Sequence, residues 1–243
     1  MALGMFSRMP LPFHIWDEKL TAHMVASLPL VGLVIGGLWW LAALLFMTLN
    51  LPLMLMAAIL AISPFFFAGF IHLDGYMDTS DALLSYRPLE DKLRILKDPN
   101  VGAFAVVMLG ILFLLQFAAM YTVAENGGAI ALLISISVVS RSCSALSIFV
   151  LKHMPQSNYA SLLAKNASAS HKIFIVTTAV AAAGLSFHYA GILGLIVVAA
   201  VVLGYVAALA FAYKEFKGIS GDLLGYAMVI AELCGLLALA VII

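Results

Sequence analysis

Charge is scarce in this chain of 243 residues. Asp, Glu, Lys and Arg make up 10% of it, whereas ordinary soluble domains contain about 25%. So few polar side chains cannot cover a water-soluble particle of this size. Twelve basic and twelve acidic residues give no net charge, which argues against nucleic acid as a partner. The two cysteines, Cys143 and Cys234, lie in apolar stretches, so we expect neither a disulfide framework nor a zinc site.

Long hydrophobic runs fill most of the chain. Hydrophobic residues make up 65% of it, and each helix that crosses a bilayer core about 30 Å thick needs about 20 apolar residues. Seven windows fit: Val25–Leu49, Leu51–Ile71, Ala103–Ala124, Ala129–Leu151, Ile173–Phe187, Tyr189–Tyr213 and Leu223–Ile243. They lack the two-residue alternation of membrane-barrel strands. We therefore predict an all-α, polytopic membrane protein with about seven transmembrane helices, embedded in a lipid bilayer as a single domain over residues 1–243.

The basic residues are distributed unevenly among the connections between these windows. Eleven of the twelve Lys and Arg lie in the N-terminal segment or in alternate connections, which span residues 72–102, 152–172 and 214–222. The connections between them contain none. Because Lys and Arg collect on the cytoplasmic side of short loops, this pattern predicts a cytoplasmic N-terminus, an external C-terminus and long polar loops in the cytosol.

Ten of the 24 charged residues lie between residues 74 and 98. Here Asp74, Asp78 and Asp81 are spaced i, i+4, i+7, which puts three carboxylates on one helical stripe about 10 Å long. Like charges at this spacing weaken a helix unless a cation lies between them. Oxygen ligands without a nearby cysteine favour Mg²⁺ or Mn²⁺, and Mg²⁺ commonly binds one or two carboxylates together with substrate phosphates. The stripe therefore predicts a metal site for a phosphorylated substrate rather than a solvated acidic helix end.

Basic residues follow this stripe in the sequence. Arg87, Arg94 and Lys97 are suited to neutralise phosphate oxygens opposite a metal that the aspartates hold. They are equally well explained as the basic residues that mark the cytoplasmic end of a span. The sequence leaves both interpretations open.

Two ionisable residues lie inside the predicted spans. Arg141 and Glu232 are each about 14 Å from the cytoplasmic ends of their windows at 1.5 Å per residue, so we expect a salt bridge between them. Such a pair either binds substrate or only fixes the packing of the helices. At the start of the last window, Asp222 follows Gly221 in a glycine-rich turn, where it serves as a helix N-cap or as a metal ligand.

A family signature overlaps the acidic stripe. The H-L-D-G-x-x-D-x-x-D motif of the cobalamin synthase family, the adenosylcobinamide-GDP ribazoletransferases, resembles His72-Leu73-Asp74-Gly75-Tyr76-Met77-Asp78-Thr79-Ser80-Asp81. The similarity extends along most of the chain. It includes Arg8-Met9-Pro10-Leu11-Pro12, Pro29-Leu30-Val31-Gly32, Lys97-Asp98 with Gly102, Arg141, and Gly221-Asp222 with Gly225 and Glu232. Ala82, Pro99 and Val229 stand where the family usually has Gly, Ser and Glu, so we expect no direct role for these three.

The resemblance implies a transferase of cobalamin biosynthesis in the prokaryotic cytoplasmic (inner) membrane, with its active site facing the cytosol. A ribose hydroxyl of α-ribazole, or of α-ribazole 5′-phosphate, would attack the corrinoid-side phosphorus of adenosylcobinamide-GDP, and GMP would leave. Attack on a pyrophosphate needs metal ions that neutralise the developing charge and a base near the hydroxyl. The implied cofactor is Mg²⁺.

The resemblance also implies roles for individual residues. Asp74 and Asp78 would bind Mg²⁺, and Asp81 would be a third ligand or the general base, with His72 as the other candidate base. The substrate site would include Arg87, Arg94, Lys97, Asp98, Arg141, Asp222 and Glu232.

Two other functions remain as alternatives. A phosphatidyltransferase-like enzyme acting on CDP-linked alcohols also displaces a nucleoside monophosphate with membrane-embedded aspartates, but its D-G-x-x-A-R spacing is absent. An ion-coupled transporter would use the acidic residues and the Arg141/Glu232 pair to line a path. However, the acids cluster at one membrane face and the sequence has no visible inverted repeat. The sequence leaves open whether the chain forms a homo-oligomer.

Overall fold

The computed structural model describes residues 1–9, 16–155, 162–163 and 166–242. Several residues discussed above lie outside these ranges. They are Pro10, Leu11 and Pro12 of the N-terminal motif, the C-terminal Ile243, and Lys165, one of the basic residues in the 152–172 connection. Within the described ranges the regular elements are helices, apart from an isolated bridge between His153 and Ile219. The prediction of an all-α chain is confirmed for this part of the sequence.

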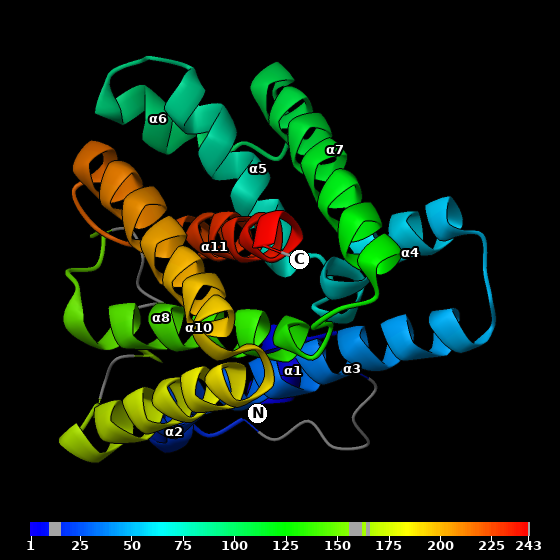
Figure 1. Cartoon of the computed structure of the whole chain (residues 1–243). Coiled ribbons are helices and arrows are strands. Elements are labelled where there is room, and N and C mark those ends of the chain that lie inside the picture. Colours follow the sequence, from blue (N-terminus) through cyan, green and yellow to red (C-terminus); the bar gives the residue numbers. More distant parts are fainter. Residues whose placement is uncertain (10–15, 156–161, 164–165, 243) are drawn as a thin grey trace.

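Five of the described helices are long and apolar enough to cross a membrane. A sixth candidate is a bent pair made of α4 (Leu53–Phe67) and α5 (Ile71–Leu84). The five are α3 (Leu28–Thr48), α7 (Ala103–Asn126), α8 (Leu132–Val150), α10 (Ala169–Phe216) and α11 (Gly221–Ile242) (Figure 1). These lengths and compositions support a polytopic membrane protein with five to six candidate spans among the described residues.

The second predicted window ends too late. We expected it to reach Ile71, but α4 ends at Phe67, and Ile71 begins α5, which is turned by 94°. The break arises at Gly69 and Phe70, whose φ angles of +73° and +62° are left-handed and cannot continue a right-handed helix. Hydropathy missed the bend because the residues on both sides of it are apolar.

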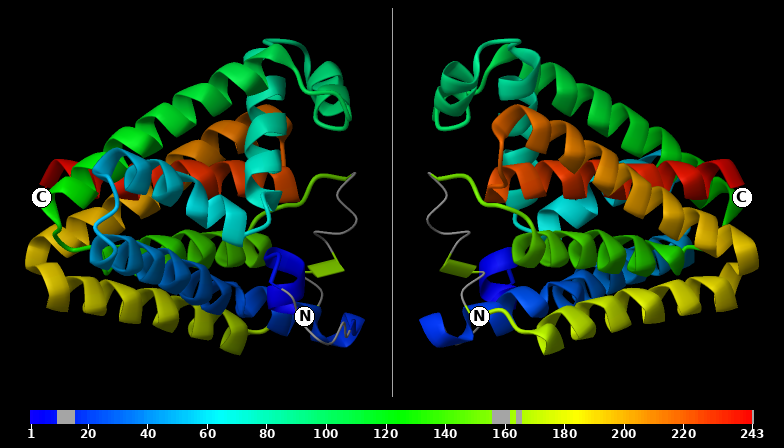
Figure 2. Two further views of the ribbon diagram at one scale, coloured as in Figure 1. Left: turned by 90° about the vertical axis from the view of Figure 1, so that its right-hand side faces the viewer. Right: turned by 90° about the vertical axis from the view of Figure 1, so that its left-hand side faces the viewer.

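The predicted break near His188 lies three residues further along the chain. Helix α10 is interrupted at Gly191, where φ is +58° and ψ is −139°, a conformation that favours glycine. Figure 2 shows that the chain then turns back toward the end from which it came. Gly194 packs directly on the backbone of Ser186 across this turn, where an added Cβ would collide.

Glycine and tryptophan contacts hold α3 in the bundle. An added Cβ on Gly36 would lie 2.7 Å from the Cα of Ile134 on α8, so α3 and α8 approach closely because this position has no side chain. The buried Trp39 donates its indole N–H to the carbonyl oxygen of Leu60 on α4 at 2.8 Å.

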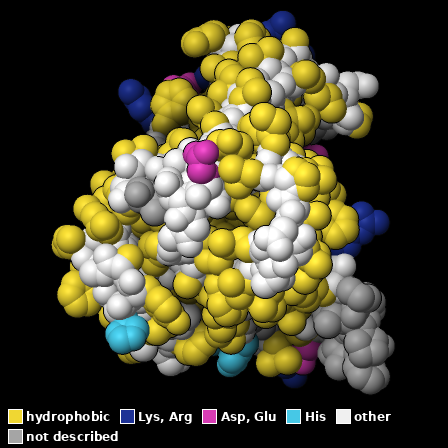
Figure 3. Space-filling model, turned by 45° about the vertical axis from the view of Figure 1, so that its right-hand side comes forward, with side chains coloured by type: hydrophobic (Ala, Val, Ile, Leu, Met, Phe, Trp, Pro, Cys, Tyr) yellow, Lys and Arg dark blue, Asp and Glu magenta, His cyan; other side chains and the backbone are white. Residues whose placement is uncertain are grey.

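Cys143 and Cys234 are free thiols, as expected. Hydrophobic side chains cover most of the face in Figure 3, as a lipid-facing surface requires.

The connections gather at two ends of the bundle. Helices α1 (Ala2–Phe6), α2 (Thr21–Ala26) and α6 (Leu89–Ile95) lie at one end together with the described residues between α8 and α10 (Figure 2). The α3–α4 and α7–α8 connections and the C-terminus lie at the other. Helix α5 crosses the bundle near the first end. The segments that carry the basic residues therefore share the end that also holds α5.

Candidate active site

Small residues bring the acidic helix α5 against the first turns of α11. An added Cβ on Gly75 would lie 2.8 Å from the Cα of Asp222, and one on Gly225 would lie 3.1 Å from the carbonyl oxygen of His72. The rings of Tyr76 and Tyr226 stack beside this contact, with centroids 5.8 Å apart. The close packing places the two motifs of the sequence, which are far apart along the chain, side by side.

Four carboxylates collect at this contact. The predicted stripe of Asp74, Asp78 and Asp81 lies on the single helix α5, with Asp74 exposed and the other two partly buried. Asp78 lies within electrostatic range of Asp74, Asp222 and Asp81. The structure thus adds Asp222 to the group of acids that the spacing alone predicted.

Ser220, not Asp222, caps helix α11. The backbone N–H of Leu223 donates to the Ser220 hydroxyl oxygen at 3.3 Å, and this hydroxyl donates to the Asp222 carboxylate at 3.4 Å. Because the hydroxyl meets the need for an N-cap, the capping alternative for Asp222 is wrong. The role of the Asp222 carboxylate as a metal ligand stays a prediction.

Asp81 contacts the beginning of α7. The backbone N–H of Ala105 donates to the Asp81 carboxylate at 3.4 Å, and Gly102 packs so closely on the same carboxylate that an added Cβ would collide with it. A carboxylate at a helix N-terminus satisfies free N–H groups and interacts favourably with the helix dipole. Asp81 therefore fixes α7 relative to α5, in addition to any role in binding or catalysis.

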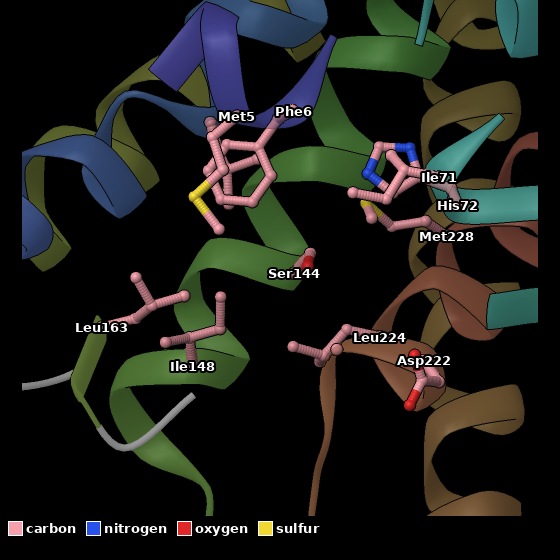
Figure 4. Close-up of a pocket in the computed structure, with 12 residues that line it drawn as sticks. Met5, Phe6, Ile71, His72, Ser144, Ile148, Leu163, Asp222, Leu224 and Met228 are labelled. Carbon is pink, nitrogen blue, oxygen red and sulfur yellow. The ribbon is translucent and has the colours of Figure 1, made fainter. Parts of the chain in front are cut away.

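Two pockets meet at Gly221 and Asp222. The larger, of about 310 Å³, is walled mostly by apolar side chains of α1, α3, α8 and α11, and His72, Ser144 and Asp222 contribute its polar groups (Figure 4). The smaller, of about 120 Å³, includes Lys97 and Ser220. Asp222 therefore lines both a mostly apolar cavity and a cavity whose wall includes the Lys97 side chain.

The predicted cations differ in their positions. Lys97 lines the smaller pocket with Asp222. Arg87 is exposed, and the exposed Arg94 forms an ion pair with Asp91 at 3.6 Å on the same helix. The structure thus places Lys97 beside Asp222. Neither Arg87 nor Arg94 lines any of the described pockets.

The Asp98 carboxylate is held by its own loop. The Asn100 backbone N–H and side-chain amide donate to it at 2.9 Å and 2.7 Å. These hydrogen bonds, the backbone one foremost, lower the pKa of Asp98 because they favour its charged form. Its position stabilises the turn before α7, and a role in substrate binding stays a prediction.

The expected salt bridge between Arg141 and Glu232 is confirmed. The two residues are 1% and 6% exposed, and their side chains form an ion pair between α8 and α11. Arg141 also donates to the Ser137 carbonyl oxygen at 3.1 Å, and the Ser140 hydroxyl donates to Glu232 at 2.9 Å. The buried His72 lies within electrostatic range of Arg141. The pair is thus enclosed beside the candidate base.

The described residues contain no group of three His, Cys, Asp or Glu side chains arranged to hold a metal ion by themselves. The donor chemistry nevertheless fits a hard cation, because Asp78 has three carboxylates as electrostatic neighbours and oxygen ligands suit Mg²⁺. A magnesium ion here would need ligands beyond the protein, such as phosphate oxygens or water. The predicted Mg²⁺ therefore remains a prediction.

The sequence did not reveal the apolar pocket or its polar wall. Met5, Phe6 and Met228 line it, but in a chain this hydrophobic they look like any other packing or lipid-facing residues. Ser144 was also missed. Its only signal was its position one helical turn after Arg141, which places both on one face of α8.

A family model and several named proteins match this chain over nearly its whole length. A family model described as cobalamin-5-phosphate synthase matches residues 1–240. A Clostridium perfringens protein named adenosylcobinamide-GDP ribazoletransferase is 40% identical over 242 residues, which cover 100% of this chain and 96% of that protein. A protein of the same name from Lachnoclostridium phytofermentans is 36% identical, and the match covers 99% of this chain and 92% of that protein. Another from Geobacillus kaustophilus is 32% identical, and the match covers 93% of this chain and 88% of that protein. No solved structure matches.

Proposed function

The chain belongs to the cobalamin-5-phosphate synthase family, and we propose that it joins adenosylcobinamide-GDP to α-ribazole or α-ribazole 5′-phosphate. A ribose hydroxyl attacks the corrinoid-side phosphorus, the bond from that phosphorus to GMP breaks, and GMP leaves. The other product is adenosylcobalamin or its 5′-phosphate. The match over residues 1–240, with relatives that bear this enzyme's name, carries the proposal.

The aspartate cluster is the proposed magnesium site. We assign the ligands to Asp74, Asp78 and Asp222, because Asp78 lies within electrostatic range of the other two and Asp222 packs on α5 and lines both pockets. When bound, Mg²⁺ would neutralise phosphate oxygens as negative charge develops during the transfer. Mg²⁺ commonly binds only one or two protein carboxylates directly, so one or two of these three acids would bind it and phosphates and water would supply the other ligands.

The proton of the attacking hydroxyl needs an acceptor. His72 is the stronger candidate by position, because it lines the larger pocket. Its burial near Arg141 favours the neutral imidazole, which is the form that accepts a proton, but also weakens it as a base. Asp81 remains the second candidate, as a base or a third ligand, although its carboxylate already binds the start of α7.

Lys97 is the proposed contact to the phosphates of adenosylcobinamide-GDP. Its position beside Asp222 lets an ammonium group bind the oxygens that face away from the acids. Arg87 and Arg94 are exposed near the same end of the bundle and would bind outlying parts of this large substrate. Asp98, Arg141 and Glu232 support the site through the loop and helices that they stabilise.

We place the protein in the cytoplasmic (inner) membrane with seven spans and the active site toward the cytosol. The break at Gly191 divides α10 into two segments, which would supply two of the spans. The basic segments and α5 share one end of the bundle, and basic residues mark the cytoplasmic side.

The proposal is tested with protein purified in detergent and mixed with adenosylcobinamide-GDP, α-ribazole and Mg²⁺, with and without EDTA. We expect equal amounts of GMP and complete corrinoid, and we expect EDTA to abolish both. Restoring Mg²⁺ should restore the reaction, which controls for damage by the chelator. Absence of GMP from protein that unfolds cooperatively on heating would reject the proposal.

The same assay separates the proposed function from the two alternatives. A transferase that uses CDP-linked alcohols would release CMP from such substrates, and a transporter would move substrate into proteoliposomes without breaking a bond. The family match and the names of the relatives favour neither.

A further inference from the structure

We propose that the larger pocket binds the aromatic base of α-ribazole and so selects the acceptor substrate. This inference rests on the proposed function and adds a binding site to it. The pocket adjoins Asp222 and His72, which the proposed mechanism uses. It is therefore placed to hold the molecule whose hydroxyl reacts.

The lining of the pocket matches the chemistry of this base. Dimethylbenzimidazole is a flat, mostly apolar double ring with two methyl groups. The apolar wall comes from four different helices and includes Met5, Phe6, Leu28, Ile148, Leu224 and Met228. Aromatic and sulfur-containing side chains contact flat rings favourably. The apolar part of the pocket thus suits the ring carbons and methyl groups of this base, while its one unsubstituted ring nitrogen needs a hydrogen-bond donor such as Ser144 or His72 in the wall.

The other substrate fits this pocket poorly. Guanine has several hydrogen-bonding groups, and burying them against apolar side chains without partners is costly. The corrin macrocycle is far larger than a cavity of about 310 Å³, which lies at the small end of the range for ligand sites, about 300–1,000 Å³. Both parts of adenosylcobinamide-GDP are therefore expected outside it.

The polar groups of the pocket orient the acceptor. His72 and Asp222 lie on the side formed by α5 and α11, while Met5 and Phe6 of α1 lie across the cavity (Figure 4). A base packed against α1 and α8 would direct its ribose toward His72 and the acids. The smaller pocket, with Lys97, shares Gly221 and Asp222 with the larger one, and the donor phosphates would bind there. The two substrates would thus meet at Asp222.

A lipid acyl chain is the competing occupant in a membrane protein. It would fill the apolar part, but it gains nothing from His72, Ser144 or Asp222, and a carboxylate in the wall disfavours it. The geometry favours an occupant that is apolar at one end and polar at the other.

The decisive variant is Ser144→Leu, which narrows the pocket from α8. We expect KM for α-ribazole to rise about tenfold, since the added side chain takes space that the base needs, while KM for adenosylcobinamide-GDP changes less than twofold. The matched control is Ser147→Leu, one turn further along α8, because Ser147 lines a separate cavity beside Tyr205. The control should leave both KM values near those of the unmodified protein.

A second measurement uses the unmodified protein and does not depend on the folding of a variant. With the riboside of unsubstituted benzimidazole, KM should rise about tenfold, because two methyl groups no longer enter an apolar site. The pocket assignment would be overturned, in favour of lipid as the occupant, by two results together in a preparation whose unmodified protein releases GMP. The first is a KM for α-ribazole in Ser144→Leu equal to that of the unmodified protein. The second is a KM of the unmodified protein for the benzimidazole riboside equal to its KM for α-ribazole. A rise in KM for adenosylcobinamide-GDP instead would overturn it in favour of the donor. Absence of GMP release would reject the proposed function itself.

Discussion

Two groups of charged residues lie near each other in this protein, and their surroundings are opposite. Arg141 and Glu232 bind each other and neighbouring backbone and serine groups, and they are 1% and 6% exposed. Asp74, Asp78 and Asp222 have other acids as their electrostatic neighbours, and none of the three takes part in a salt bridge with a described residue. The enclosed ion pair neutralises its own charges, although the buried Arg141 Nε has no hydrogen-bond partner among the described residues, whereas the acid cluster gains stability when a cation is added. The first arrangement suits a structural role and the second a binding role.

The largest effect should come from breaking the ion pair. In Arg141→Met, Glu232 is left buried without its cation, which is expected to lower the free energy of unfolding by about 3–5 kcal/mol. Thermal unfolding in detergent would measure the loss as a lower Tm.

The double variant Arg141→Met with Glu232→Leu provides the control for this prediction. Replacing a buried pair with apolar residues is often neutral, so Tm should recover most of the loss, and GMP release should return with it. A double variant that folds but stays inactive would mean that the pair contacts substrate, and the two groups would then share one role.

Asp78→Asn tests the other side of the comparison. Loss of this carboxylate should lower kcat/KM at least about 100-fold, equivalent to about 2.7 kcal/mol, because a ligand to the metal that stabilises the transition state is removed. Tm should stay the same or rise, since one of several mutually repelling charges is gone. Glu90→Gln, an exposed acid on α6, is the matched control and should change neither quantity. A fall in Tm as large as that of Arg141→Met would show that Asp78 is structural too.

Gly75→Ala asks whether the packing of α5 on α11 creates the cluster. The new Cβ would approach the Cα of Asp222 to 2.8 Å, so the helices must separate, at a cost of about 1–3 kcal/mol. Both Tm and the affinity for Mg²⁺, measured by titrating the metal into the GMP assay, should decrease. Gly110→Ala on α7, where no atom lies within 4 Å of the added Cβ, should leave both unchanged. Normal Mg²⁺ affinity in Gly75→Ala would exclude Asp222 as a ligand.

The sequence predicted the positions of charged residues better than it predicted the course of the backbone. The helical stripe of aspartates and the Arg141–Glu232 salt bridge followed from spacing and depth alone, because helix geometry relates sequence distance directly to position. The bend at Gly69 and Phe70 was missed, since hydropathy records composition and does not detect left-handed backbone angles. The break at Gly191 was misplaced for the same reason.

Contacts between distant segments were beyond a single sequence. Asp222 was considered as a cap or a ligand, and the choice depended on Ser220, whose hydroxyl forms the cap. The apolar pocket draws residues from α1, α3, α5, α8 and α11, and its apolar residues do not differ in type from ordinary residues of a membrane helix. Such a site is defined by three-dimensional packing, which the local pattern of hydrophobic residues does not encode.

The smallest effect distinguishes the cations around the acid cluster. Lys97 and Arg94 are both exposed, but Lys97 lines a pocket with Asp222, whereas Arg94 is paired with Asp91. Lys97→Gln should raise KM for adenosylcobinamide-GDP about tenfold, about 1.4 kcal/mol, through the loss of one charge-assisted contact to phosphate. Arg94→Gln should change it less than twofold, since an exposed ion pair contributes little. Equal effects would mean that the substrate is attracted by the basic surface as a whole, and raising the salt concentration would then weaken binding to both variants alike. An effect confined to Lys97→Gln would instead identify Lys97 as the cation that binds the donor phosphates opposite the acid cluster.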